Sequence, residues 1–181
     1  YARVMINLED SYTGAVRQVT LKHFTLSEKG SPKLQERVIN VKIPKGVCEG
    51  QHIRLVKQGD KIGGGEVGDL YLEVRFLPNK LFKLDMLDVY LTLPISPWEA
   101  ALGATVKIPT PNSVVDLKIP PNSIGGQKLR LKGKGIPADI PGDMYAVIQI
   151  VLPKADSDSV KRAYEILQSS TQFNPRSNFG I

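Results

Sequence analysis

The chain has 181 residues, of which 41% are hydrophobic and 23% charged, and its formal net charge is +6. This composition is typical of soluble globular domains. No apolar run approaches the roughly 18–20 residues that span a bilayer, so we expect no membrane partner. The single cysteine, Cys48, excludes an internal disulfide and a cysteine-based zinc site, and it favours a reducing compartment, the cytoplasm. The opening residues are neither a signal peptide nor a natural start, so we expect sequence upstream of Tyr1.

The chain contains one stretch twice, at residues 41–59 and 117–135. The two copies align at a constant offset of 76 without a gap, and they share eight of 19 residues, among them Lys-Ile-Pro, Gly-Gln and Arg-Leu. A Gly-Asp-apolar-Tyr sequence follows each copy, at residues 68–71 and 142–145. Such self-similarity predicts two tandem copies of one β domain.

In the first copy, alternating apolar residues predict a strand through Val4, Ile6 and Leu8, and a second strand at Val19 and Leu21. Residues 9–14 read as a short helical turn that ends at a glycine. After a turn at 27–32, further strands are predicted at 38–43, 53–55 and 70–76. The glycines at 63–65 lack the lysine and hydroxyl of a phosphate-binding loop, so a hairpin loop is the better interpretation.

The second copy is expected to begin with a strand at Val89, Leu91 and Leu93. Ser96 can cap a short helix that starts at Pro97 and ends at Gly103. A tight hairpin turn is predicted at 111–113, and a closing strand at 145–152.

The last part of the chain predicts a helix from a cap at Asp156 or Ser157 to about Ser169, followed by a polar, loose end. Its apolar residues fall on one stripe, which consists of Val160, Ala163, Tyr164 and Leu167. A helix this short is marginal alone in water, so the stripe must pack on something.

The sequence shows no catalytic constellation: no acid–base pair, no nucleophile beside a histidine and no metal-ligand cluster. Asp69 and Asp143 repeat, but each follows a glycine at a strand entrance, where a carboxylate accepts backbone hydrogen bonds from a turn. We therefore expect no enzyme, no cofactor and no metal.

The repeated pattern, followed by Leu-Pro-Asn-Lys-Leu-Phe-Lys at 77–83 and Asp-Val-Tyr-Leu-Thr-Leu at 88–93, resembles the C-terminal substrate-binding region of DnaJ-type J-domain co-chaperones. The resemblance covers residues 4–153. It implies a mostly β chain with two tandem sandwich-like domains, short helices and a C-terminal dimerisation helix. It also implies a homodimer that holds unfolded client polypeptide and delivers it to a DnaK-type chaperone.

The chain is similar to the subclass without a zinc module, the CbpA-like proteins, because the first hairpin carries only the turn at 27–32. The His-Pro-Asp triplet of a J-domain is not in these residues, so the fragment is expected to hold clients without stimulating ATP hydrolysis. The link between the domains departs from the family pattern Phe-Lys-Arg-Asp-Gly-x-Asp-Leu, because Leu84 and Met86 replace its arginine and glycine.

The resemblance implies a client groove on the first domain and a dimer contact on the last helix. The implied client-binding residues are Val4, Val19, Leu21, Phe82 and Ala2, and the implied dimerisation residues are Val160, Ala163, Tyr164 and Leu167. A shallow apolar groove beside a strand edge can bind an extended peptide by backbone pairing. The alternative interpretation is that Val19 and Leu21 are simply core residues.

We expect the domains to span 1–83 (client binding), 84–154 (the homologous β domain) and 155–181 (dimerisation helix and tail). Two alternative functions rank below the co-chaperone hypothesis and stay open. The net charge allows a basic β module that binds nucleic acid, although only 7% of the residues are aromatic. A purely structural assembly domain is the third hypothesis.

Overall fold

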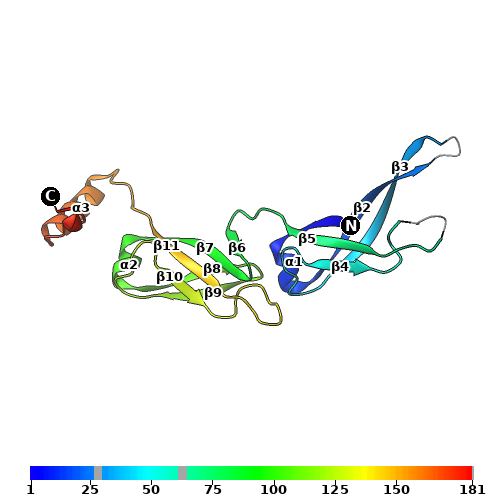
Figure 1. Cartoon of the computed structure of the whole chain (residues 1–181). Coiled ribbons are helices and arrows are strands. Elements are labelled where there is room, and N and C mark those ends of the chain that lie inside the picture. Colours follow the sequence, from blue (N-terminus) through cyan, green and yellow to red (C-terminus); the bar gives the residue numbers. More distant parts are fainter. Residues whose placement is uncertain (27–29, 61–64, 181) are drawn as a thin grey trace.

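The structure is a computed structural model, and it describes residues 1–26, 30–60 and 65–180. Two β units follow one another along the chain, and a separate helix follows the second unit (Figure 1). The prediction of a mostly β chain with two homologous sandwich-like units is confirmed. The glycine run at 63–65 and the turn at 27–32 lie partly outside the described residues.

The first unit contains a three-stranded sheet and a two-stranded ribbon. The sheet has the order β1-β5-β4, from β1 (Ala2–Ile6), β5 (Leu70–Phe76) and β4 (His52–Leu55), with β1 parallel to β5. The ribbon is an antiparallel pair, β2 (Ala15–Leu26) and β3 (Pro32–Ile43). Inward-facing residues of β1, β3 and β5 form one buried apolar cluster, so ribbon and sheet enclose the core of this unit.

The second unit repeats this plan and adds one strand. Its sheet has the order β10-β11-β7-β6, from β10 (Lys128–Leu131), β11 (Met144–Ile150), β7 (Asp88–Ile95) and β6 (Phe82–Asp85). Its ribbon pairs β8 (Ala104–Thr110) with β9 (Ser113–Ile119). Strand β6 pairs antiparallel with β7, whose counterpart β1 has only β5 beside it in the described sheet.

Each unit carries a short helix after its first long strand. These are α1 (Leu8–Thr13) and α2 (Pro97–Leu102), and each ends at a glycine with a positive φ, Gly14 or Gly103. The predicted helices are confirmed, but Leu8 opens α1 instead of ending the first strand. The cause is the Asn7 cap: Asp10 at the third helical position accepts a hydrogen bond from the Asn7 N–H at 3.0 Å.

The two units meet at α1, which packs on the second unit (Figure 1). Leu8 and Tyr12 belong to the apolar cluster of that unit, and the Tyr12 hydroxyl donates to the carbonyl of Lys134 at 2.9 Å. Gly46 lies so close to Pro137 that a Cβ there would stand 2.4 Å from the Pro137 oxygen. A side chain at position 46 would therefore force the units apart.

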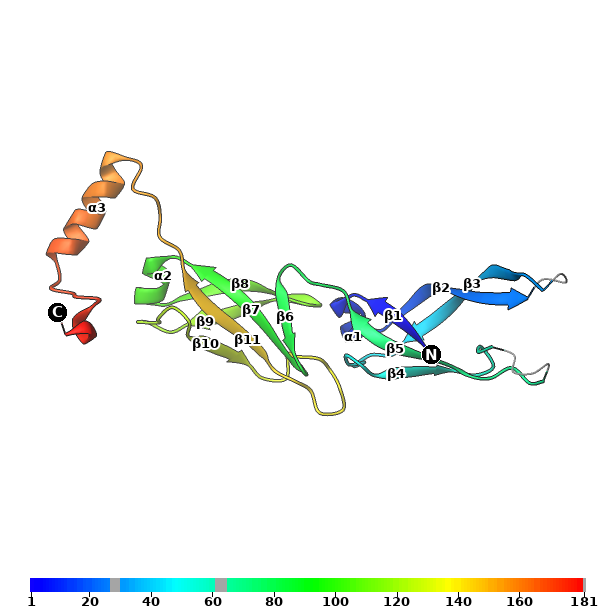
Figure 2. The ribbon, with the colours of Figure 1, turned by 45° about the horizontal axis from the view of Figure 1, so that its top comes forward.

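The closing strand is shorter than predicted, because β11 ends at Ile150. Its partner strand β7 ends opposite, at Ile95, and continues into α2. The C-terminal helix α3 (Asp158–Ser169) is confirmed, with Ser157 as its cap. The end after it includes a short 3-10 helix, η1 (Ser177–Phe179), where the sequence predicted a loose segment. The ribbon drawing places α3 apart from both β units (Figure 2).

Candidate functional site: an open strand edge and an uncovered helix

Strand β1 forms the edge of the first sheet. It pairs with β5 on one side, and no described strand pairs with its other side. In the second unit the corresponding side of β7 is covered by β6, with Phe82 opposite Leu91 and Leu84 opposite Val89 (Figure 2). The first unit therefore exposes backbone groups that its own repeat keeps paired.

Four of the five predicted client-binding residues lie together in the first unit. Val4 is buried at 3% exposure, while Ala2, Val19 and Leu21 are half-buried and pack against the same apolar cluster. Phe82 is separate from them: it lies on β6 of the second unit, is 6% exposed and belongs to that unit's core cluster. Its assignment to the client groove, like that of the other four, stays a prediction.

Two charged side chains of the ribbon in this region, Arg17 and Lys22, are paired with carboxylates. Arg17 donates from Nε to a carboxylate oxygen of Asp10 at 2.9 Å, and Lys22 lies 3.1 Å from Glu36. The hydrogen bond and the charge of Asp10 raise the pKa of Arg17. Arg17 and Lys22 are thus neutralised locally, whereas Arg37, the partner of Leu21 across the ribbon, forms no ion pair with a described residue.

The repeated aspartates hold turns, as the sequence predicted. Asp69 accepts the backbone N–H of Lys57 at 2.9 Å and the Arg54 Nε at 2.7 Å. Asp143 accepts the N–H of Gly133 and the Nε of Arg130, each at 2.8 Å. These bonds, the backbone bond first, lower the pKa of both carboxyl groups. Both carboxylates therefore have a structural role.

The outer face of each sheet carries a stacked tyrosine pair. Tyr1 and Tyr71 stack at 5.4 Å between ring centroids, and Tyr90 and Tyr145 stack at 5.2 Å. A basic residue from the neighbouring strand accompanies each pair: His52 meets Tyr1 edge-on at 6.2 Å, and Lys128 lies 5.5 Å above Tyr90. The repeated Gly-Asp-apolar-Tyr sequence supplies one tyrosine of each pair, Tyr71 and Tyr145. The strands that supply the other tyrosine could not be assigned from sequence.

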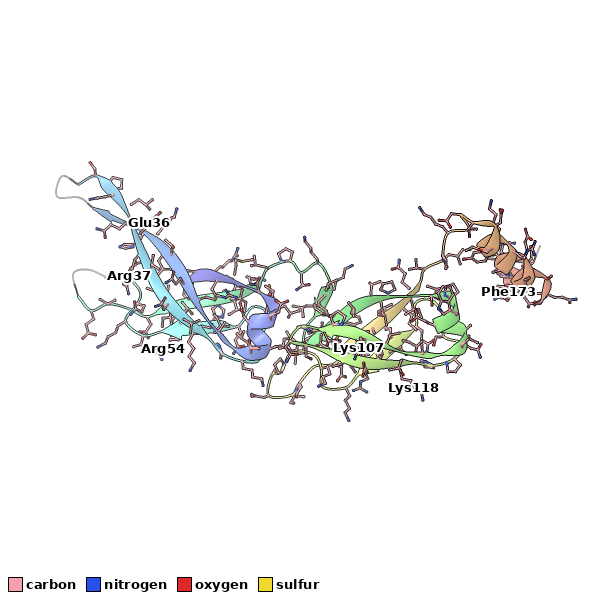
Figure 3. The ribbon with its side chains drawn as sticks, turned by 180° about the vertical axis from the view of Figure 1, so that it is seen from behind. Glu36, Arg37, Arg54, Lys107, Lys118 and Phe173 are labelled. Carbon is pink, nitrogen blue, oxygen red and sulfur yellow. The ribbon has the colours of Figure 1, made fainter. Side chains whose placement is uncertain are left out.

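Helix α3 has no buried residue, although its apolar stripe is formed as predicted. Val160 and Tyr164 are half-buried, and Ala163 and Leu167 are exposed. The Tyr164 hydroxyl donates to the Pro153 carbonyl at 2.8 Å, beside a hollow of about 560 Å³ between the helix and residues 152–155. Phe173 extends the exposed apolar surface at this end of the molecule (Figure 3).

Cys48 lies at the joint between the units. Its Sγ donates to the Gly46 carbonyl at 3.3 Å, and burial, with the charge of Asp139 next, raises the pKa of the thiol. A thiol with a raised pKa is a poor nucleophile. Among residues 1–26, 30–60 and 65–180, no group of three or more His, Cys, Asp or Glu could hold a metal ion. No helix in this part of the chain is long and apolar enough to cross a membrane.

Residues 1–153 match the family model described as the DnaJ C terminal domain. The chain belongs to this family. Among curated relatives, the chain is 46% identical over 178 residues to a protein named Curved DNA-binding protein from Coxiella burnetii, which covers 97% of this chain and 57% of that protein. Proteins of the same name from Pseudomonas syringae and Salmonella arizonae are 40% and 44% identical over 95% and 87% of the chain. The chain thus spans about half the length of these relatives.

Strand β6 was not predicted from the sequence, although it most distinguishes the two halves of this DnaJ C-terminal domain. Phe82-Lys83-Leu84-Asp85 does alternate between apolar and polar residues, which is the signal of a half-buried strand. The signal is only four residues long and ends in Met86-Leu87, which carries no turn residue.

Proposed function

We propose that this DnaJ C-terminal domain binds extended segments of unfolded polypeptide along the open edge of β1. The observation that carries the proposal is the difference between the two repeats: β7 is covered by β6, and its counterpart β1 is not covered by any described strand. A client segment would occupy, in the first unit, the place that β6 occupies in the second. Backbone pairing of this kind accepts many sequences, as a receptor for unfolded chains requires.

Apolar side chains of the first unit support the proposal. Phe82 of β6 lies opposite Leu91 of β7. The residue of β1 that corresponds to Leu91 is the small residue Ala2. Ala2 leaves room for a large apolar client residue, while the half-buried Val19 and Leu21 offer further apolar surface. Covering one such side chain fully contributes about 1.5–3 kcal/mol, so several shallow contacts give a moderate and reversible affinity.

The resemblance extends the proposal to the whole protein. We propose that the chain acts within a longer, dimeric co-chaperone and delivers its clients to a DnaK-type chaperone. The uncovered stripe of α3 supports the homodimer, because a 12-residue amphipathic helix needs an apolar partner and the described part of this chain provides little. A dimer would hold two client edges at once and increase avidity for long unfolded chains.

A titration with a model peptide tests the client site. The probe is a synthetic peptide with the sequence of residues 79–85, which contains β6, added to the isotope-labelled chain. We expect the backbone amide signals of β1 to shift and their hydrogen exchange to slow. Leu21→Ser should weaken binding about tenfold, whereas Leu117→Ser, at a half-buried leucine of the second ribbon, should not. Perturbation that leaves β1 unaffected would contradict the proposal.

Nucleic-acid binding is the second candidate. The relatives' names say that they bind curved DNA, and the repeated tyrosine pairs each have a basic residue beside them. Aromatic faces beside cations are what single-stranded nucleic acids stack on, whereas duplexes bind mainly through phosphate contacts. Arg37, Arg54, Lys107 and Lys118 are distributed along both units (Figure 3), but Arg54 and Lys107 are already paired with carboxylates.

Fluorescence anisotropy with labelled duplex and single-stranded DNA tests this candidate. Binding that weakens steeply with salt and fails in Lys128→Gln would support it. Lys80→Gln, at an exposed lysine away from the tyrosine pairs, is the matched control. An equal loss of DNA binding in both variants would show only a general effect of net charge.

A further inference from the structure

Each unit has one end that carries its short helix, α1 or α2, and an opposite end formed by loops; we call these the helix end and the loop end. Both units point the same way along the molecule (Figure 1). The helix end of the first unit, α1, sits on the loop that joins β10 to β11 in the second unit. The helix end of the second unit, α2, and the loop end of the first unit point away from this joint (Figure 1). The chain thus forms one joint and leaves the corresponding surface of its first unit uncovered in the described structure.

The covered surface is known in detail. Tyr12 donates its hydroxyl to the Lys134 carbonyl at 2.9 Å, and burial raises the pKa of that hydroxyl. Leu8, one helical turn before Tyr12, is 2% exposed and belongs to the same apolar cluster. Val115 and Leu131 of the second unit pack against that cluster. A loop end therefore accepts a helix that presents a leucine and, four residues later, a tyrosine.

The uncovered surface contains the counterparts of these residues at the offset of 76. Ile39, Leu55 and Gln58 correspond to Val115, Leu131 and Lys134. All three line a cavity of about 350 Å³, together with Asn40, Arg54 and Val56. Figure 3 shows Arg54 on the first unit, on the side of α1 that is away from the second unit. The same strands thus meet at this end, with a hollow in place of a packed helix.

Two differences make the uncovered surface a better receptor than its repeat. Val56 replaces Lys132 and is 60% exposed, so the rim is more apolar. The Oε1 atom of Gln58 is buried and has no hydrogen-bond partner among the described residues. A buried acceptor without a donor costs about 1–3 kcal/mol, and a bound hydroxyl would remove that cost.

We propose that this cavity of the first unit binds a short helix of another polypeptide, one that carries an apolar residue and a tyrosine four residues later. The apolar residue packs on Ile39, Leu55 and Val56. The Gln58 side chain turns its Oε1 toward the cavity and accepts from the tyrosine hydroxyl, in the role that the Lys134 carbonyl has in the joint. In a second copy of this chain, α2 has Pro97 and Ala101 at the positions of Leu8 and Tyr12. Helix α3 does carry an apolar residue four residues before Tyr164, but the Tyr164 hydroxyl already donates to the Pro153 carbonyl. The site is separate from the β1 edge and takes a helix, not an extended chain.

Nuclear magnetic resonance with the full chain tests the proposal. The probe is a synthetic peptide with the sequence of residues 5–14, kept helical by a hydrocarbon staple between positions 9 and 13, which are exposed in α1. We expect the backbone amide signals of Ile39, Leu55 and Gln58 to shift in a saturable manner. A peptide with phenylalanine in place of tyrosine should bind about three- to tenfold more weakly, because Gln58 then stays unpaired.

Substitutions in the chain complete the test. Val56→Asp should abolish the shifts, whereas Val114→Asp, at a valine that is 66% exposed on β9, should preserve them. Gln58→Leu should make the tyrosine and phenylalanine peptides bind equally. The proposal is overturned if the peptide shifts only signals of the second unit by displacing α1, or shifts none. It is also overturned if the same signals broaden with protein concentration alone, because a second copy would then cover the cavity.

Discussion

At the scale of single residues, the repeated aspartates couple electrostatics to the turn geometry of both units. Asp69 holds Arg54 and the turn at Lys57, and Asp143 holds Arg130 and the turn at Gly133. Their pKa values are lowered in the folded state, so the unfolded chain binds more protons as the pH falls. The stability that they contribute is complete above about pH 4 and is lost as the pH falls through the lower folded pKa values.

We therefore expect Asp69→Asn to lower stability at neutral pH and to flatten the fall in stability below pH 4. Urea unfolding between pH 2 and 7 measures both effects. Asp116→Asn removes a surface carboxylate that pairs with Lys107 at 3.0 Å, and should change neither. An unchanged pH dependence in Asp69→Asn would show that the turn does not depend on the charge.

Met86 has a φ of 53° and is 86% exposed, in the left-handed region that favours glycine. It occupies the position where the pattern of the DnaJ C-terminal region has glycine. A side chain in this conformation lowers the free energy of unfolding by about 1–2 kcal/mol. The substitution by glycine recovers only part of this, because glycine has greater freedom in the unfolded chain.

Met86→Gly should therefore raise the free energy of unfolding by about 0.5–1 kcal/mol. Chemical denaturation measures it. Ile140→Gly, at a loop residue that is 82% exposed and has no positive φ, should give no gain. A loss of stability in Met86→Gly would mean that the methionine side chain stabilises the turn between β6 and β7.

At the scale of elements, β6 decides how the two repeats differ. The sequence predicted strands β5 and β7 and helix α2 well, because alternation, proline and glycine mark their ends. It did not predict β6, because four residues carry a weak signal and the turn at Met86 lacks turn chemistry. The predicted boundary between residues 83 and 84 stays a prediction, and β6 crosses it. Short edge strands depend on their neighbours more than on their own pattern.

Phe82→Ala should lower the free energy of unfolding by about 3–5 kcal/mol, because Phe82 is 6% exposed in the core of the second unit. Leu81→Ala, at the neighbouring leucine with 56% exposure, should cost less than about 0.5 kcal/mol. Urea unfolding compares them. Normal stability with lost peptide binding in Phe82→Ala would instead place Phe82 in the client groove.

Helix α3 leads to a prediction about assembly. Leu167→Asp should convert the proposed dimer to monomers, because it places a charge in the only apolar stripe of this helix. Ser169→Asp adds the same charge in the same last turn but on the opposite face, and should preserve the dimer. Sedimentation velocity measures the masses. Identical masses for both variants and the unmodified chain would assign the stripe to another partner.

At the scale of the whole molecule, the internal repeat determines most of the architecture. The offset of 76 predicted two units, and the structure shows what the first unit lacks: among the described residues, no strand takes the place of β6 and no helix covers the loop end. Sequence could predict the repeat because identical residues align. It could not predict these differences, because they depend on which strands become neighbours in space.

Apolar client binding at the β1 edge of the first unit can be measured on the whole chain. The assay follows how far the chain suppresses aggregation of a chemically denatured model protein, at low and at high salt. We expect the unmodified chain and Leu117→Ser to suppress aggregation equally at both salt concentrations, and Leu21→Ser to lose most of this ability while staying folded. Failure of the folded, unmodified chain to suppress aggregation, or suppression that disappears with salt, would contradict apolar client binding at this edge.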